Sequence, residues 1–510
     1  MTDNDPSTKD GQGPARAKAV QISPLWIILI ILAAIAVTFT ITALLMSIFQ
    51  HKQESAAQTA PVVALDDTTY DPAVWGQNYP SQYEGWAATA EFTPSNHSQA
   101  LEPLDRDGDP RTEVTGDKTV EDPRLKVLWA GYPFATEYRH ARGHAYMTLD
   151  QTYTLRVIEY NQPGTCVNCH ASMPHVYEEL GDGNMEAGFL KLGTMPLEEV
   201  LPMAETPVAC IDCHDPQTMA LRISRPAFMT GIAQVKLYED GIEDYDVNRD
   251  ATRNEMRSYV CAQCHVEYYF AGEDKVLAFP WKNGLDLDGI WQTYMDNGHV
   301  DWVHAETGAA VLKAQHPEFD VWSQGVHAAN GVSCADCHMP YQRNGSIKLS
   351  DHQITSPVAN YNTACGSCHD TRGDTLENRV KTIQDNFIES RDRSLDATVA
   401  LINDLKTAVD KGTATEEELT NARYFQNKAS FYTDYLYSEN SYGFHAPDYS
   451  QRILSQALDA ARKGQLALKG VPMEELAPSE ISMRNAQEAA RYQNIVSDAD
   501  AAPVNQAAGD

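Results

Sequence analysis

The pentapeptide Cys166-Val-Asn-Cys-His170 recurs four times with changed middle residues, as CIDCH at 210–214, CAQCH at 261–265, CADCH at 334–338 and CGSCH at 365–369. These motifs contain all ten cysteines of the 510-residue chain. Two thiols three residues apart can bond to both vinyl groups of one haem, and the histidine that follows can bind the iron. The pattern predicts five covalently attached haems c, held by Cys166, Cys169, His170, Cys210, Cys213, His214, Cys261, Cys264, His265, Cys334, Cys337, His338, Cys365, Cys368 and His369.

Two other uses of paired cysteines explain this pattern less well. A disulfide framework has no need for a histidine after every second cysteine. Zinc sites with four ligands do not require five copies of one pentapeptide. Haem attachment accounts for the cysteine spacing and for the histidine together.

An uncharged and strongly apolar stretch lies near the N-terminus, from Trp26 to Phe49. It is longer than the apolar part of a secretory signal and long enough to cross a bilayer. Arg16 and Lys18 precede it, and positive residues favour the cytoplasmic side. We therefore expect a cytoplasmic tail at 1–21, a single uncleaved transmembrane anchor at 22–50 and a remainder on the extracytoplasmic side of the cell membrane. A cleaved signal peptide is the alternative.

The charge balance bounds the partners of the exported part. The chain has 71 acidic and 39 basic residues and a formal net charge of −32. No run of basic residues is present, which argues against nucleic acid as a partner. A small anionic substrate would therefore need a local positive field to enter.

The sequence changes character along the exported part, and this predicts its domains. Residues 51–85 are rich in Ala, Pro and polar residues and are predicted to be a linker. In 86–373 Pro and Gly interrupt short periodic pieces, which is typical of a pentahaem region with short helices. Residues 374–480 predict long helices, and 481–510 a flexible tail. The predicted fold class is mainly α, a multihaem cytochrome c core with little sheet.

Three long helices are expected after the last motif. Asp374-Thr-Leu-Glu377 is typical of a capping box, the second helix is expected to start at Thr415-Glu-Glu-Glu418, and the third after Pro447. Apolar residues follow the helical period through the first of these segments. Such stripes indicate packing within the chain and also suit the interface of a homodimer.

The histidines outside the motifs are the candidates for the second axial position of each iron. If all five haems only carry electrons, five further ligands are needed, whereas one catalytic haem leaves four. Spacing alone does not choose among the eleven candidates, which are His51, His97, His140, His144, His175, His299, His304, His316, His327, His352 and His445.

Three strings resemble a known enzyme family. They are Cys261-Ala-Gln-Cys-His-Val-Glu-Tyr-Tyr-Phe270, Leu312-Lys-Ala-Gln-His-Pro317 and Cys334-Ala-Asp-Cys-His-Met-Pro340. They are similar to strings of the pentahaem, ammonia-forming cytochrome c nitrite reductases, and the resemblance runs from about Gly131 to Pro447.

The resemblance implies a set of site residues. The catalytic haem is the one attached at Cys166 and Cys169, with Arg142, Tyr268 and His316 in its distal pocket. The second axial ligands are His352 for the second haem, His144 for the third, His445 for the fourth and His327 for the fifth. One calcium ion is held by Glu267, by the carbonyls of Tyr268 and Lys313, and by the side chain of Gln315, all oxygen donors as calcium prefers.

The implied activity is the six-electron reduction of nitrite to ammonium, fed by four bis-histidine haems and a membrane quinol-oxidising cytochrome or another donor. Many family members carry lysine where this chain has His170. Two alternatives stay open: a non-catalytic electron-transfer cytochrome, and a related reductase of hydroxylamine or sulfite. A high-spin haem would distinguish an enzyme from a carrier.

Overall fold

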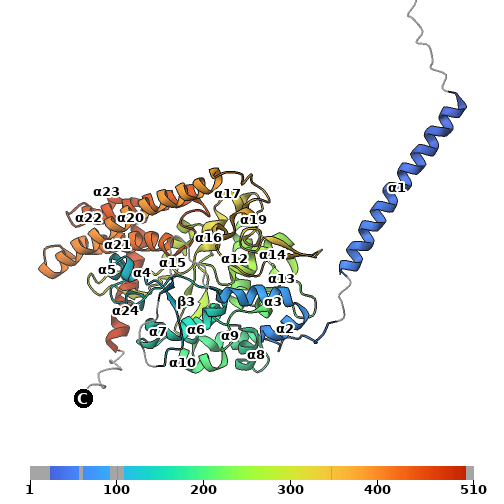
Figure 1. Ribbon diagram of the computed structural model, residues 1–510. Coiled ribbons are helices and arrows are strands. Elements are labelled where there is room, and N and C mark those ends of the chain that lie inside the picture. The colour runs from blue at the N-terminus through green and yellow to red at the C-terminus, as the bar shows by residue number, and fades with distance from the viewer. Residues whose placement is uncertain (1–22, 57–60, 92–99, 102–107, 346, 501–510) are drawn as a thin grey trace, which may run out of the picture. The chain divides into compact units, whose positions relative to one another are not determined.

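The computed structural model describes residues 23–56, 61–91, 100–101, 108–345 and 347–500 (Figure 1). The chain divides into two compact units, 1–62 and 63–510. The cytoplasmic tail predicted at 1–21 lies outside the described residues.

The first unit contains one long apolar helix, α1 (Pro24–Ala56). Its section Pro24–Ile48 is long and apolar enough to cross a membrane, and none of this section is buried. The predicted anchor therefore coincides with a single continuous helix. Thr38, Thr40 and Thr42 bond to carbonyls one turn earlier, which removes their hydroxyls from the apolar surface.

The second unit is mainly helical, as predicted, and most elements before residue 374 are short. In its first part these are α2 (Pro72–Asn78), α3 (Pro80–Ala87), η1 (Ala88–Ala90), α4 (Lys118–Glu121), α5 (Arg124–Leu128), η2 (Pro133–Ala135), η3 (His144–Tyr146), α6 (Met147–Tyr153), α7 (Leu155–Ile158) and η4 (Gly164–Cys169). Next come α8 (Pro174–Leu180), α9 (Met185–Gly193), α10 (Leu197–Val200), η5 (Leu201–Met203), α11 (Cys210–Cys213), α12 (Pro226–Asp240), α13 (Val247–Asp250) and α14 (Arg253–Ala262). The part up to the last motif contains α15 (Leu287–Asn297), α16 (Glu318–Ser323), α17 (Val326–Ala329), α18 (Cys334–His338), η6 (Pro357–Asn360) and α19 (Tyr361–Cys365).

Sheet is confined to antiparallel pairs of short strands in the described part of the chain. The pairs are β1 (Ala100–Leu101) with β2 (Val114–Thr115), β3 (Tyr269–Ala271) with β4 (Val276–Ala278), β5 (Trp302–Val303) with β6 (Ala310–Val311), and β7 (Tyr341–Asn344) with β8 (Ile347–Ser350). Isolated pairs of this size are not stable alone. They therefore serve as local braces between the helices and loops that carry the motifs.

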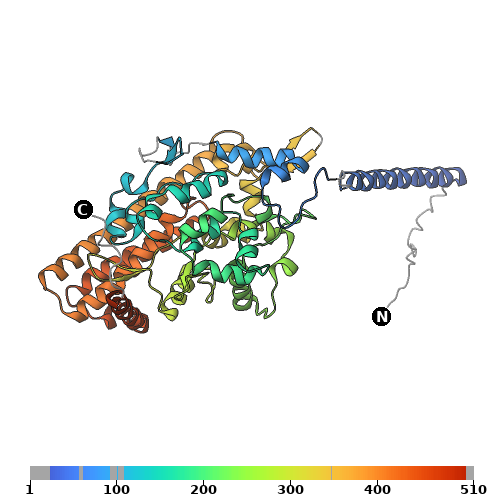
Figure 2. The ribbon, with the colours of Figure 1, turned by 90° about the horizontal axis from the view of Figure 1, so that it is seen from below.

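Long helices dominate the C-terminal part and lie together in both views (Figures 1 and 2). They are α20 (Thr375–Lys411), α21 (Glu416–Ser438) and α22 (Pro447–Ala467), followed by α23 (Met473–Leu476), η7 (Pro478–Glu480) and α24 (Ile481–Asp500). Helix α21 starts where predicted, and Thr415 and Glu418 form a capping box there. Asp374 precedes α20 but makes no side-chain cap bond, so that predicted box is not formed. Leu401, Ile402 and Leu405 of α20 are fully buried, as their helical period predicts.

The predicted linker and tail are more ordered than the sequence suggested. Helices α2 and α3 lie within 51–85 or at its end, and Trp75 is buried there. The indole of Trp86 donates to the carbonyl of Val208, 2.9 Å away. At the other end, α24 covers much of 481–510, and its buried Gln487 donates to the carbonyl of Ala310. Tertiary contacts made by polar groups and single aromatic rings therefore order both segments.

Candidate haem and reaction site

Four motif histidines each face one other histidine. The ring centroids lie 6.3 Å apart for His214 and His352, 6.4 Å for His265 and His144, 6.4 Å for His338 and His445, and 6.3 Å for His369 and His327. Such a gap suits two imidazoles that share one iron at roughly 2 Å each, the length of zinc–imidazole bonds. These are the pairs that the resemblance implied, and the residues present fit haems c at these positions.

Backbone carbonyls orient several of these rings. His214 Nδ1 donates to the carbonyl of Met219 at 3.0 Å, His352 Nδ1 to Ser350 at 2.9 Å, and His338 Nδ1 to Thr355 at 3.1 Å. The Nδ1–H bond fixes the tautomer and leaves Nε2 as the ligand atom. His445 Nδ1 instead lies 2.7 Å from a carboxylate oxygen of Glu439, in the geometry of an ion pair rather than an aligned hydrogen bond.

His170 differs from the other motif histidines. In the part of the chain that the structure describes, no histidine ring faces it at the spacing of the four pairs. Burial first, and then the nearby charges of Arg156 and His316, lower the pKa of His170 to about 3. The Thr148 hydroxyl of α6 donates to its carbonyl at 2.9 Å. The surroundings of His170 therefore offer a cation and an imidazole, without a second histidine placed as a ligand.

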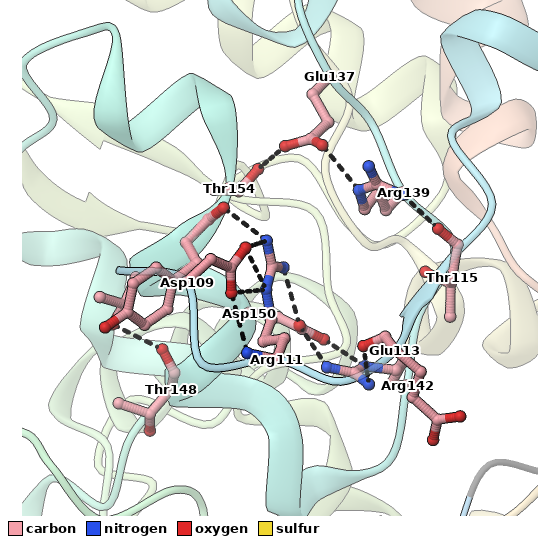
Figure 3. Close-up of polar contacts among 12 residues, drawn as sticks. Asp109, Arg111, Glu113, Thr115, Glu137, Arg139, Arg142, Thr148, Asp150 and Thr154 are labelled. Carbon is pink, nitrogen blue, oxygen red and sulfur yellow. Dashed lines mark hydrogen bonds and ion pairs between the residues drawn. The ribbon is translucent and has the colours of Figure 1, made fainter. Parts of the chain in front are cut away.

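The structure corrects the predicted role of Arg142. Its guanidinium makes a two-pronged pair with Asp150, with Nε–Oδ2 2.7 Å and Nη2–Oδ1 2.6 Å, and it also donates to the carbonyl of Glu113 (Figure 3). Its side chain is 2% exposed and its guanidinium lies over the Tyr146 ring. A cation already neutralised by a carboxylate is a poor binder of a second anion. Arg142 thus secures the loop that leads to His144.

Arg156 is the cation near His170. It lies on α7, and its guanidinium carbon is 4.8 Å from the centroid of the Phe134 ring. Its charge lowers the pKa values of His170, of Cys166 and of Tyr268, although burial raises the pKa of the latter two overall. Among the described residues no carboxylate pairs with this guanidinium. The Arg156 side chain is also partly exposed. Its positive charge therefore remains available for an anion.

Tyr268 and His316 lie on two segments that meet beside the first motif. Tyr268 follows the third motif, and burial raises its pKa well above 10.0, with further contributions from Cys169 and Cys166. Burial lowers the pKa of His316 to about 4, so the ring is neutral at pH 7. His316 makes no ring contact with a motif histidine in the described chain, so it is not placed as an axial ligand.

The four predicted calcium ligands also lie together. Glu267 is fully buried. Its carboxylate accepts hydrogen bonds from the Tyr294 hydroxyl and from the backbone N–H of Gln315, both at 2.8 Å. The Gln315 side chain lies 3.3 Å from the carbonyl of Lys313, and the Tyr294 hydroxyl contacts the carbonyl of Tyr268.

The charge around Glu267 fits a bound cation. Burial raises the pKa of Glu267 well above 4.5, and the charges of Asp320 and Asp301 raise it further. The hydrogen bonds from Gln315 and Tyr294 lower the pKa, but by less. A buried carboxylate beside two others is costly unless a cation compensates it. Calcium binds oxygen donors of these kinds: the Glu267 carboxylate, the carbonyls of Tyr268 and Lys313, and the side-chain oxygen of Gln315. The Gln315 side-chain nitrogen now lies toward the Lys313 carbonyl, so its amide group would turn over to bind the ion.

The third motif contacts the first and the fourth through their cysteines. Cys169 of the first motif interacts with Cys264 of the third, and Cys261 of the third interacts with Cys334 of the fourth. The third motif therefore lies between the first and the fourth.

The chain is similar over most of its length to known proteins. The family model described as cytochrome c552 matches residues 71–507. A cytochrome c-552 of Bacteroides fragilis is 35% identical over 455 residues, covering 87% of this chain and 86% of the relative. A cytochrome c-552 of Porphyromonas gingivalis is 34% identical over 439 residues, covering 84% and 80%.

The chain belongs to the cytochrome c552 family. Its fold is also that of the catalytic subunit of the cytochrome c nitrite reductase of Desulfovibrio desulfuricans, with a TM-score of 0.68 and 28% identity, covering 82% of this chain and 90% of that one. That structure is described with two calcium sites. This member is thus a multihaem cytochrome c with covalently bound haem and an extracytoplasmic cytochrome domain.

One residue of the site was missed by sequence reasoning. Between Arg142 and the first motif the sequence contains a single further arginine, Arg156. The predicted pocket arginine was chosen by its place before His144, yet Asp150 lies within the same stretch and neutralises it. The available signal was that Arg156 is the one further arginine before the first motif, on the predicted side of the attachment site.

Proposed function

We propose that this cytochrome c552 family member reduces nitrite to ammonium at the haem held by Cys166, Cys169 and His170. The reaction takes up six electrons and eight protons for each nitrite and yields one ammonium ion and two waters. The observation that supports it most is the contrast between His170 and the other four motif histidines. In the chain as described only His170 lacks a facing histidine, and Arg156 and His316 lie near it, with Tyr268 near Cys166 and Cys169.

Arg156 is proposed to hold the substrate anion. Its guanidinium has several donors and no carboxylate partner among the described residues. It also lies in a chain whose net charge of −32 repels anions elsewhere. The haem supplies an open iron and electrons when it is bound. Arg156 therefore orients nitrite and stabilises the charge that develops on the departing oxygens.

His316 and Tyr268 are proposed to handle protons. A buried imidazole that is neutral at rest takes up a proton from solvent and donates it to a departing oxygen. The buried Tyr268 hydroxyl keeps its proton at working pH because its pKa is raised, so it acts as a hydrogen-bond donor. Both groups lie on the segments that also carry the proposed calcium ligands.

A calcium ion held by Glu267, the Tyr268 and Lys313 carbonyls and the Gln315 amide oxygen is proposed to fix these segments. Its positive charge lies next to the pocket and adds to that of Arg156. We further propose that the four paired histidine sites hold electron-carrying haems, for five haems in all. The contacts between motifs support a relay through the third haem to the first. A quinol-oxidising membrane cytochrome or another donor would supply the electrons, with α1 as the membrane anchor.

The decisive test is the product balance of the detergent-purified full chain. Nitrite and a reduced viologen are supplied, and nitrite consumed, ammonium formed and donor oxidised are measured together. The proposal expects one ammonium and six oxidised one-electron donors for each nitrite. Release of nitric oxide or hydroxylamine as the main product, or no turnover with all haems loaded, would contradict it and favour a related reductase or a carrier, respectively.

A further inference from the structure

Figure 3 shows that the polar network before the first motif has two carboxylate centres. Asp150 binds Arg111 and Arg142, with Arg111 also paired to Asp109 at 2.8 Å. Glu137 forms the second centre with Arg139 and Thr154. The second centre bonds to Thr154 and Leu155 at the start of α7, the helix that carries Arg156, whereas the first reaches only the carbonyl of Tyr153, through Arg111.

Helix α7 is too short to hold its own position. It spans four residues, Leu155–Ile158, and a single turn of helix is unstable in isolation. Its N-cap residue, Thr154, makes no side-chain cap bond within the helix. The placement of Arg156 therefore depends on what the rest of the protein attaches to this turn.

Glu137 provides that attachment. Its Oε2 accepts the backbone N–H of Leu155 at 2.6 Å and the hydroxyl of Thr154 at 3.0 Å. Its side chain is fully buried, so water does not compete for these bonds. The backbone is thus held at the residue that directly precedes Arg156.

The same segment also contacts the side chain of Arg156. Phe134 lies three residues before Glu137, and its ring lies 4.8 Å from the guanidinium carbon. The segment from 134 to 137 therefore holds both the helix turn and the guanidinium. A cation over an aromatic face also gains electrostatic stabilisation.

The charge of Glu137 is compensated without using Arg156. Its Oε1 accepts the Nε–H of Arg139 at 2.7 Å, and Arg139 itself donates to the carbonyl of Thr115 at 2.5 Å. Arg139 therefore balances the carboxylate, and the guanidinium of Arg156 stays unpaired among the described residues. A carboxylate that held Arg156 directly would compete with an anionic substrate.

We propose that Glu137 is a positioning residue that holds α7 so that Arg156 points its unpaired guanidinium at the anion bound opposite His170. The inference rests on the proposed function. It adds that a buried carboxylate outside the pocket sets the affinity for nitrite through the backbone of α7.

The test compares wild type, Glu137→Gln and Asp109→Asn as detergent-purified full chains. Asp109 is a matched control, because it is also a buried carboxylate paired with an arginine but belongs to the other centre. The readouts are haem content, the dissociation constant for nitrite from the optical shift of the oxidised protein, and KM and kcat.

Glu137→Gln is expected to raise the dissociation constant and KM for nitrite by about tenfold or more, since misplacing a binding group by ~1 Å costs up to about 100-fold. Asp109→Asn is expected to lower thermal stability without this rise. In an Arg156→Ala background, Glu137→Gln should add nothing, because the two residues act in series.

Three outcomes decide the matter. Unchanged nitrite affinity and KM in Glu137→Gln, with wild-type haem content, would overturn the positioning role. So would an undiminished effect in the Arg156→Ala background. If Glu137→Gln loses haem, Thr154→Ala removes one of the two bonds alone and is expected to raise KM in the same direction by a smaller factor. A wild type that reduces nitrite only to other products would instead overturn the proposed function.

Discussion

Four of the five motif histidines face a histidine, whereas the first lies near Arg156 and His316, with Tyr268 near its two cysteines. The five pentapeptides themselves are chemically alike, so the motif does not determine which iron is open. The difference arises from what the fold brings opposite each motif. The lesson is that attachment is encoded locally, whereas reactivity is encoded by distant segments of the chain.

Removing the cation opposite His170 should have the largest effect. Arg156→Ala is expected to lower kcat/KM for nitrite by about 100- to 1000-fold, comparable to the loss of an oxyanion donor. Arg142→Ala is expected to act mainly on stability, because it leaves the Asp150 carboxylate with one cation fewer. Steady-state kinetics and thermal unfolding of both variants test this contrast.

The two arginines would exchange roles in a contrary result. If Arg142→Ala abolished turnover while Arg156→Ala stayed near wild type, the bidentate pair with Asp150 would have to open during catalysis. The distinction drawn between the two cations would then be wrong.

Removing one facing histidine should convert a carrier site into an open one. His352→Ala is expected to add a second high-spin ferric haem, because His214 then lacks its partner 6.3 Å away. His316→Ala is expected to leave the number of low-spin haems unchanged, since that ring contacts no motif histidine in the described chain. Electron paramagnetic resonance with spin quantification measures both. A new high-spin signal in His316→Ala would show that this residue is an axial ligand.

The cation site should respond to loss of one charge. Glu267→Gln keeps the shape of the side chain but removes the negative charge that attracts the calcium ion. Affinity for calcium is expected to fall by more than about 100-fold, since even outer-shell partners of a metal contribute ~10- to 100-fold. Metal analysis and calorimetric titration of the full chain measure this. Equal calcium content in wild type and variant would remove the site from the account.

A histidine without a haem should titrate, in contrast to those that bind iron. His304 is 1% exposed, donates to the carbonyl of Val127 at 2.9 Å and accepts the amide of Glu306 at 3.3 Å. Burial, opposed by the bond to Val127, lowers its pKa below 6.5. The folded state therefore favours the neutral ring, and the stability it contributes is complete above pH 6.5 and is lost as the pH falls towards the folded pKa.

This effect should be the smallest of the set. The melting temperature of wild type is expected to drop between pH 7.5 and 5.5 more than that of His304→Gln, which cannot take up the proton. Parallel pH profiles of the two proteins would show that His304 stays unprotonated, or is protonated without cost, throughout.

Much of the fold could be predicted from periodicity and motif chemistry. The three long helices begin at Thr375, Glu416 and Pro447, within two residues of their predicted starts, because a helical stripe and its N-cap are local signals. Helices α2 and α24 were not predicted. Their order depends on long-range contacts with the main body, of α2 with α11 and of Gln487 in α24 with the carbonyl of Ala310, which leave no period in the sequence.

The site divides in the same way. The attachment residues follow from the pentapeptides alone, and the facing histidines required the resemblance because nothing in their spacing relates them. The pocket arginine could not be chosen by position, since Arg142 and Arg156 both precede the first motif. Their difference is whether a carboxylate neutralises them, and only the tertiary arrangement around Asp150 and Glu137 reveals it.

The measurement that tests the central claim most directly is the spin state of the haems in the oxidised full chain, before and after nitrite is added. Quantified electron paramagnetic resonance is expected to show one high-spin haem per chain alongside low-spin haems, with nitrite altering that one signal alone. Low-spin signals from every haem, unchanged by nitrite, would show that His170 has a partner ligand and that the chain is an electron carrier.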